Sequence, residues 1–76
     1  MKLVQQIQYI ESTEALFKFR YGNGIEVDGE FWFVKFLPLS GIMYAECGRQ
    51  VITLTYNLSI DLNSNIDRLT EVIKEL

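Results

Sequence analysis

The amino-acid sequence predicts an α+β fold, in which a small antiparallel β-sheet of four to six strands precedes one C-terminal α-helix packed on one sheet face. Three observations support this prediction. Apolar and polar residues alternate through much of the chain up to residue 56, the pairs Asp28-Gly29 and Gly48-Arg49 are typical of hairpin turns, and the last residues carry an apolar stripe at helical spacing. We expect one domain over residues 1–76, with strands over about residues 2–56 and the helix over about residues 64–76.

The composition is that of an ordered, acidic chain. Of its 76 residues, 49% are hydrophobic and 13% aromatic, whereas disordered chains are poor in both. The net charge of −3 gives no general attraction to nucleic-acid phosphates or anionic lipids. The one cysteine, Cys47, cannot form an intramolecular disulfide, and no apolar run approaches the length of a membrane span. These features favour a cytoplasmic protein without membrane association.

The N-terminal part is the most ambiguous. Over residues 3–10, the apolar residues fit both helical spacing and one face of a strand, and their Val, Ile and Tyr content favours a strand. Residues 15–21 alternate more clearly, so we expect a second strand there, with Phe17 and Phe19 on one face and Lys18 and Arg20 on the other. Residues 12–14 would then form the hairpin turn.

The middle of the chain reads as a series of hairpins. A short edge strand, residues 25–27, leads through the type I′ pair Asp28-Gly29 into the aromatic run at residues 30–37, which Pro38 ends. Two further strands, residues 42–47 and 50–56, are joined by the glycine-first pair Gly48-Arg49, which suits a type II′ turn. The chain closes with candidate N-caps at residues 63–65 and an amphipathic helix from Ile66 to Leu76.

No catalytic residue, cofactor site or metal site is predicted. The chain has no histidine, so the commonest general base is missing, and its glycines do not form a phosphate-binding loop. The segment at residues 61–67 offers oxygen ligands at alternate positions, as an EF-hand loop does. However, Ile66 replaces the glycine of the sharp turn and Val72 replaces the bidentate glutamate, so we interpret this segment as a helix cap.

The aromatic run at residues 30–37 carries the functional hypothesis. As a strand it places Trp32, Val34 and Phe36 on one face, which a single short helix could cover. The other face must either line a small barrel formed by a curled sheet or remain free for another molecule. The residues we expect at such a contact are apolar or basic on the strand and acidic around the hairpin: Phe31, Phe33, Lys35 and Leu37, with Glu26, Asp28 and Glu30 as a charged rim.

The sequence therefore favours a non-enzymatic binding or regulatory protein that acts by protein–protein contact. A homodimer, an adaptor, an accessory subunit and an inhibitor of a larger enzyme complex, such as phages and mobile elements encode, all fit this hypothesis, the last by analogy. The alternative is a small β-barrel that binds single-stranded nucleic acid through Lys18, Arg20 and nearby aromatic residues. The net negative charge weighs against that alternative, and the sequence does not identify the partner.

Overall fold

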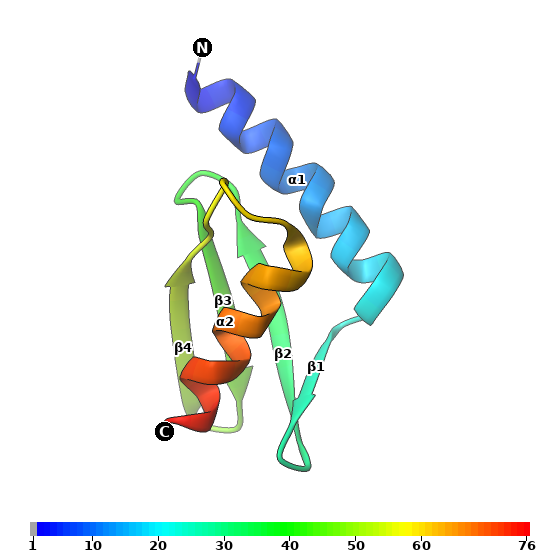
Figure 1. The fold of residues 1–76 in the computed structure, drawn as a ribbon, viewed down its shortest axis with the longest axis vertical. Helices are drawn as coiled ribbons and strands as arrows, with labels where there is room; N and C mark the ends of the chain where they lie inside the picture. The colour runs from blue at the N-terminus through cyan, green and yellow to red at the C-terminus, as the bar shows by residue number, and fades with distance from the viewer. Residues whose placement is uncertain (1) are drawn as a thin grey trace.

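The computed structural model describes residues 2–76, and the side chains of residues 4–76. It contains two helices and a four-stranded antiparallel sheet with the strand order β1-β2-β3-β4 (Figure 1). The strands follow one another as hairpins, so each pairs with its neighbour in the chain. The elements are, in order, α1 (Lys2–Tyr21), β1 (Gly24–Val27), β2 (Glu30–Leu37), β3 (Ile42–Cys47), β4 (Gln50–Thr55) and α2 (Leu62–Lys74).

This arrangement confirms the α+β class, the antiparallel sheet and the C-terminal helix. The sheet is open rather than closed into a barrel, because β1 and β4 are its edges and do not pair with each other. The two predicted hairpin turns are also present. Asp28 and Gly29 have φ angles of 52° and 84°, as a type I′ turn requires, and Gly48 has a φ of 60°, as the first position of a type II′ turn requires.

The strands predicted over residues 3–10 and 15–21, with their turn at residues 12–14, are wrong, because α1 spans this whole segment. The buried side chains of α1 recur at helical intervals: Ile10, Thr13 and Phe17. Gly22 ends the helix with a φ of 82°, and its N–H donates to the Lys18 carbonyl at 3.0 Å. The side chain of residue 3, the first residue of the strand predicted over residues 3–10, lies outside the described side chains.

The N-terminus of α2 also differs from the prediction. The helix begins at Leu62 rather than at about residue 64, and Asp61 is its N-cap, since the Asp61 Oδ1 accepts a hydrogen bond from the Ser64 backbone N–H at 2.8 Å. Residues 63–65, which we expected to cap the helix, therefore lie inside it. This N–H donation lowers the pKa of the Asp61 carboxyl.

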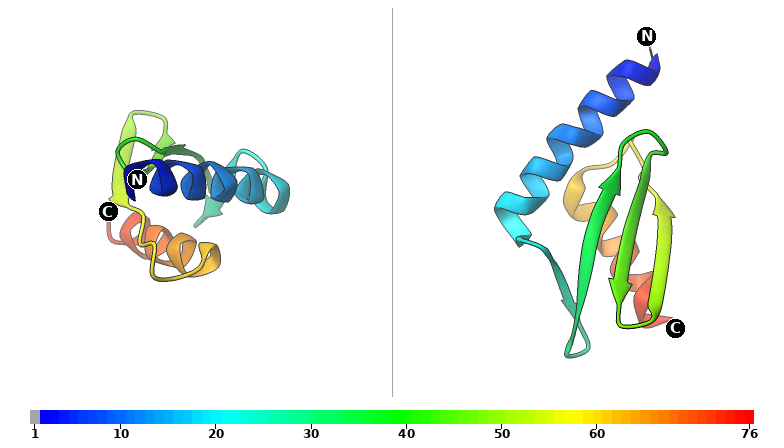
Figure 2. Two further views of the ribbon diagram at one scale, coloured as in Figure 1. Left: turned by 90° about the horizontal axis from the view of Figure 1, so that it is seen from above. Right: turned by 180° about the vertical axis from the view of Figure 1, so that it is seen from behind.

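Both helices lie on the same face of the sheet. Seen from above, α2 lies below the strands and α1 crosses the middle of the view, and seen from behind the strands lie in front of α2 (Figure 2). The core forms between this inner face and the helices, where Phe17 of α1 packs edge-on against Phe36 of β2 with ring centroids 5.5 Å apart. The strand side chains of this core are Ile25, Val27, Trp32, Val34, Phe36, Met43, Ala45 and Ile52.

Candidate functional site

The outer face of the sheet, opposite the helices, is the surface that the sequence singled out. On β2, Phe31, Phe33, Lys35 and Leu37 are all exposed, whereas the alternate residues Trp32, Val34 and Phe36 are buried. The exposed fraction is 53% for Phe33 and 1% for the adjacent Trp32. The alternation of side chains along the strand thus places the two sets on opposite faces, as predicted, and the face with Phe31 and Phe33 is the exposed one.

Phe31 and Phe33 form the aromatic centre of this outer face. Their rings meet edge to face at 87°, with centroids 5.1 Å apart, although both side chains remain about half exposed. Gly24 of β1 is opposite Phe33 and leaves no room for a larger residue. A Cβ atom at Gly24 would lie 1.9 Å from the Trp32 carbonyl oxygen and 3.0 Å from the Phe31 ring. The close approach of β1 and β2 at this point therefore requires glycine.

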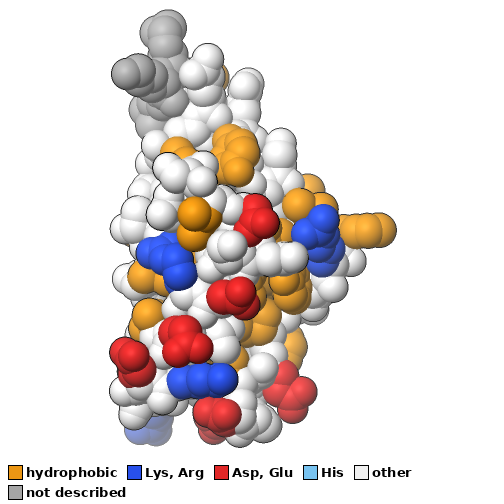
Figure 3. Space-filling view, viewed as in Figure 1, with side chains coloured by type: hydrophobic (Ala, Val, Ile, Leu, Met, Phe, Trp, Pro, Cys, Tyr) orange, Lys and Arg blue, Asp and Glu red, His pale blue; other side chains and the backbone are white. Residues whose placement is uncertain are grey.

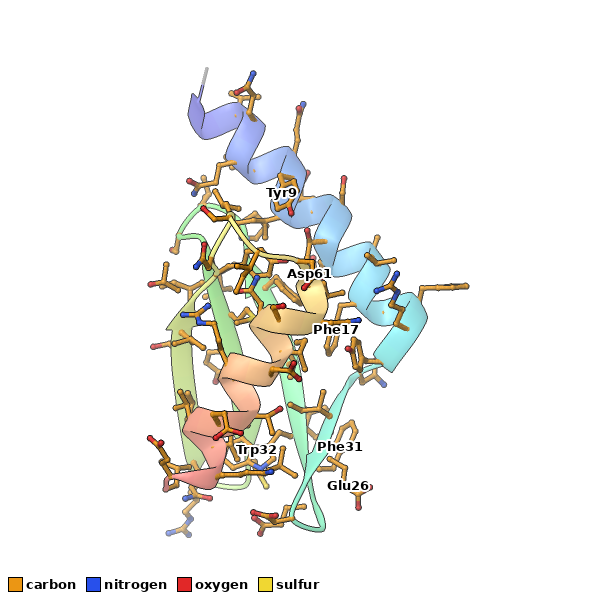
Figure 4. All side chains as sticks on the ribbon, viewed as in Figure 1. Tyr9, Phe17, Glu26, Phe31, Trp32 and Asp61 are labelled. Atoms are coloured by element: carbon orange, nitrogen blue, oxygen red, sulfur yellow. The ribbon has the colours of Figure 1, made fainter. Side chains whose placement is uncertain are left out.

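Acidic residues flank the aromatic pair on both neighbouring strands. Glu26 of β1 is directly opposite Phe31, and Glu46 of β3 is directly opposite Phe33. Figure 4 shows Glu26 and Phe31 together near the hairpin, whereas Trp32 lies beneath α2. Asp28 and Glu30 are exposed at the hairpin turn itself. The structure therefore brings all the predicted contact residues to one side or one end of the sheet.

The outer face extends beyond the predicted residues onto β3 and β4. Val51 is 52% exposed and lies in one row with Phe33 and Glu46, and the next row contains Lys35, Tyr44 and Thr53. The alternation of β4 placed Val51 and Thr53 on a common face, but only the strand register aligns that face with Phe33. Sequence reasoning therefore omitted Val51, Tyr44 and Glu46.

Tyr44 and Glu46 interact on this face. The Tyr44 hydroxyl donates to Glu46 Oε1 at 3.3 Å. Partial burial, followed by the charge and hydrogen bond of Glu46, raises the pKa of the Tyr44 hydroxyl, so this group stays neutral near pH 7. It offers hydrogen bonds rather than charge.

An apolar groove continues the outer face toward α1. It has a volume of about 480 Å³ and its lining includes Leu37, Pro38 and Leu39 from the end of β2 and the following loop, and Ile7 from α1. Leu39 is 74% exposed. Apolar side chains of the outer face therefore lie in two places, at the aromatic pair and at Leu37 beside α1, with Lys35 between them.

The basic residues of the nucleic-acid alternative lie on α1, where Lys18 lines a pocket together with Phe33 and Lys35 of β2. Lys18 and Arg20 are in the last turn of α1, where their charge is favourable at the helix C-terminus. Phe17 points into the core and stacks on Tyr21 with centroids 4.9 Å apart, whereas Phe19 is 88% exposed between the two basic residues. The predicted common face for Phe17 and Phe19 is therefore wrong, because the segment is helical.

The described residues contain no cluster of three or more His, Cys, Asp or Glu side chains arranged to hold a metal ion. Within residues 2–76, no helix is both long enough and apolar enough to cross a membrane. No family model, curated protein or solved structure matches this chain.

Proposed function

We propose that this protein is a non-enzymatic binding protein that contacts a partner protein through the outer face of its sheet. The observation that carries the proposal is the exposure of the Phe31–Phe33 pair on a face that neither helix covers. Both rings already rest against each other, so they lose little conformational freedom on binding. Aromatic side chains held in this way are common anchors at the centre of protein interfaces.

The surroundings of the aromatic pair support the same proposal. Val51 and Leu37 add apolar side chains to the outer face. Negative charge surrounds the aromatic pair at four positions: Glu26, Asp28, Glu30 and Glu46. An acidic rim of this kind attracts a partner with a basic patch and accelerates its association at low salt. In this role the protein acts as an inhibitor, an adaptor or an accessory subunit.

The composition supports a non-enzymatic role. The chain has no histidine, and its one cysteine lies at the end of β3. Cys47 is half-buried and packs against the core, as a small apolar residue does. Binding by shape and charge requires none of the activated groups that the chain lacks.

Capture from a lysate of the host organism, with the immobilised protein as bait, tests the proposal. The Phe33→Ser variant should lose a partner that the wild type retains, because it removes half of the aromatic pair. The Phe19→Ser variant is the matched control, since it removes an equally large exposed ring from α1 rather than from the sheet. Circular dichroism would establish that both variants fold. Equal retention of every captured protein by the wild type and Phe33→Ser would overturn the proposal.

The nucleic-acid alternative assumed a barrel, whereas the sheet is open and Lys18 and Arg20 lie on α1. Titration of labelled oligonucleotides separates the two hypotheses. Binding through Lys18, Arg20 and Phe19 would weaken steeply as salt rises and would be lost in Phe19→Ser but not in Phe33→Ser.

A further inference from the structure

The outer face of the sheet has a projecting part and a hollow part. The projecting part is the aromatic pair, Phe31 and Phe33, whose rings pack edge to face and are each about half exposed. The hollow part is the groove of about 480 Å³ beside α1, which Leu37 lines from β2 and Leu39 lines from the following loop. A cavity of roughly 150 Å³ holds one benzene ring, so this groove has room for a phenyl side chain.

The two parts lie on either side of Val34 in β2. Along the strand, Phe31 and Leu37 are equally far from Val34, and so are Phe33 and Lys35. A two-fold axis that lies along the outer face and crosses β2 at Val34 therefore exchanges the members of each pair. Two copies that meet face to face about this axis place each Phe31 over the partner's Leu37, at the edge of the partner's groove. Each copy then supplies one aromatic pair and receives one, as in an isologous interface.

The charges of the outer face match under the same rotation. Lys35 of one copy lies over the partner's Phe33, and Glu46 is directly opposite Phe33 in the strand register, so the lysine is also beside the partner's Glu46. A basic side chain above an aromatic ring and next to a carboxylate is favourable on both counts. Lys18 adds to the basic side, because it lines one pocket with Lys35, Phe33 and Glu14, and the lysines there outnumber the carboxylate.

The outer face is large enough for a reversible dimer. It comprises four strands, of which β2 has eight residues. At roughly 3.3 Å per residue and 4.8 Å per strand, it measures about 26 by 19 Å, so two copies bury about 1,000 Å² in total. An area of this size is at the lower limit for a specific interface, and we therefore expect a weak dimer.

We propose that the partner of the outer face is a second copy of this chain, bound face to face about the Val34 axis with the strands of the two sheets antiparallel. A second copy fits because the aromatic pair, the groove, Lys35 and Glu46 complement one another on a single face. The side that carries the helices, by contrast, shows acidic and basic side chains interspersed over α2, as on a solvated surface (Figure 3). This inference rests on the proposed function, since it names the partner of the same surface.

Sedimentation velocity of the full chain, from micromolar to submillimolar concentrations, tests the inference. The wild type should show a concentration-dependent monomer–dimer equilibrium. Leu39→Ser removes an apolar side chain of the groove, acts at both symmetric sites, and should raise the dimer dissociation constant by at least about tenfold. Phe19→Ser removes an exposed ring from α1 and should leave the dissociation constant within about threefold of the wild-type value.

A charge exchange tests the alignment of the two copies. Lys35→Glu and Glu46→Lys should each weaken the dimer, because each places like charges beside each other across the interface. The double variant restores opposite charges and should recover most of the affinity. Glu71→Lys on α2 is the matched control and should leave the dissociation constant unchanged. In a mixture of isotope-labelled and unlabelled chains, filtered NMR should show contacts between the Phe31 ring of one copy and the Leu37 methyl groups of the other.

The outcomes separate this inference from the proposed function. A wild type that stays monomeric over the whole concentration range overturns the inference, and the proposed function then stands only if partner capture still depends on Phe33. A dimer that persists in both Leu39→Ser and Lys35→Glu also overturns the inference, because it forms through another surface. A dimer that both substitutions weaken, with recovery in the charge exchange, supports it.

Discussion

Asn65 of α2 should be among the most sensitive positions for stability, although it is neither apolar nor part of the outer face. Its side chain is completely buried. The Oδ1 atom accepts from the Asn57 N–H at 2.9 Å and from Arg68 Nη1 at 2.8 Å, and Nδ2 donates to the carbonyls of Asn57 at 3.0 Å and Asp61 at 2.9 Å. This one amide group therefore attaches the loop between β4 and α2 to the helix.

The magnitude follows from these four hydrogen bonds. A net contribution of about 0.5–1.5 kcal/mol each gives roughly 2–6 kcal/mol for the group, and the shared partners reduce the effective loss to about 3 kcal/mol. A chain of this length has a total free energy of unfolding of roughly 4–11 kcal/mol. Asn65→Ala should therefore remove a large part of the stability.

Urea unfolding followed by tryptophan fluorescence measures this loss, because Trp32 is the only tryptophan and is 1% exposed in the folded state. Thr70→Ala is the matched control on the same helix: its hydroxyl makes one hydrogen bond, to the Ile66 carbonyl at 2.8 Å, and alanine favours the helix. We expect the control to cost less than about 1 kcal/mol. If Asn65→Ala costs no more than Thr70→Ala, the side-chain network does not hold the loop as described.

Two further predictions concern the helices. Phe17→Ala should destabilise the protein by about 3–5 kcal/mol, because the ring is buried against Phe36 and Tyr21, whereas Phe19→Ala on the solvent side of α1 should stay within about 0.5 kcal/mol. Equal losses of unfolding free energy in Phe17→Ala and Phe19→Ala, measured with urea, would contradict the helical structure of this segment. For Asp61, the folded-state pKa is lower than the unfolded one, so its capping contribution is complete above the unfolded value, near about 4, and disappears as the pH falls through the folded value. The thermal midpoint of Asp61→Ala should thus lie a few degrees below that of the wild type at pH 7, and this difference should shrink in acid. Asp61→Asn, whose side chain can still accept the capping hydrogen bond, is the control. A difference in thermal midpoint that does not change with pH would contradict the assignment of Asp61 as the N-cap.

The hairpins could be predicted from sequence because their signals are local. Asp28-Gly29 and Gly48-Arg49 specify turns through the backbone conformations that glycine and aspartate tolerate, and the turns fix which residues pair. Alternation then assigns each side chain to a face. This is why the division of β2 into the buried Trp32 face and the exposed Phe33 face is correct.

The N-terminal helix could not be predicted in the same way because its apolar stripe is weak. Thr13 occupies a buried position of the stripe, and its hydroxyl is satisfied by donating to the Tyr9 carbonyl at 2.9 Å within the helix. Phe19, in contrast, is apolar but faces solvent. Together they make the segment resemble two alternating strands with a polar turn between them. Tertiary packing against Phe36, rather than local pattern, decides the structure here.

The second helix, α1, leaves the outer face of the sheet exposed. The sequence allowed for one helix and left open whether sheet curvature would cover Phe31 and Phe33. The structure adds a helix of 20 residues, yet α1 packs on the same inner face as α2, where Phe36 and Trp32 already require cover. Burial of Phe31 and Phe33 by this chain would need a third layer or a closed sheet, and the described residues form neither. Half-exposed aromatic rings add little to folding stability, and this supports the proposed contact with another molecule.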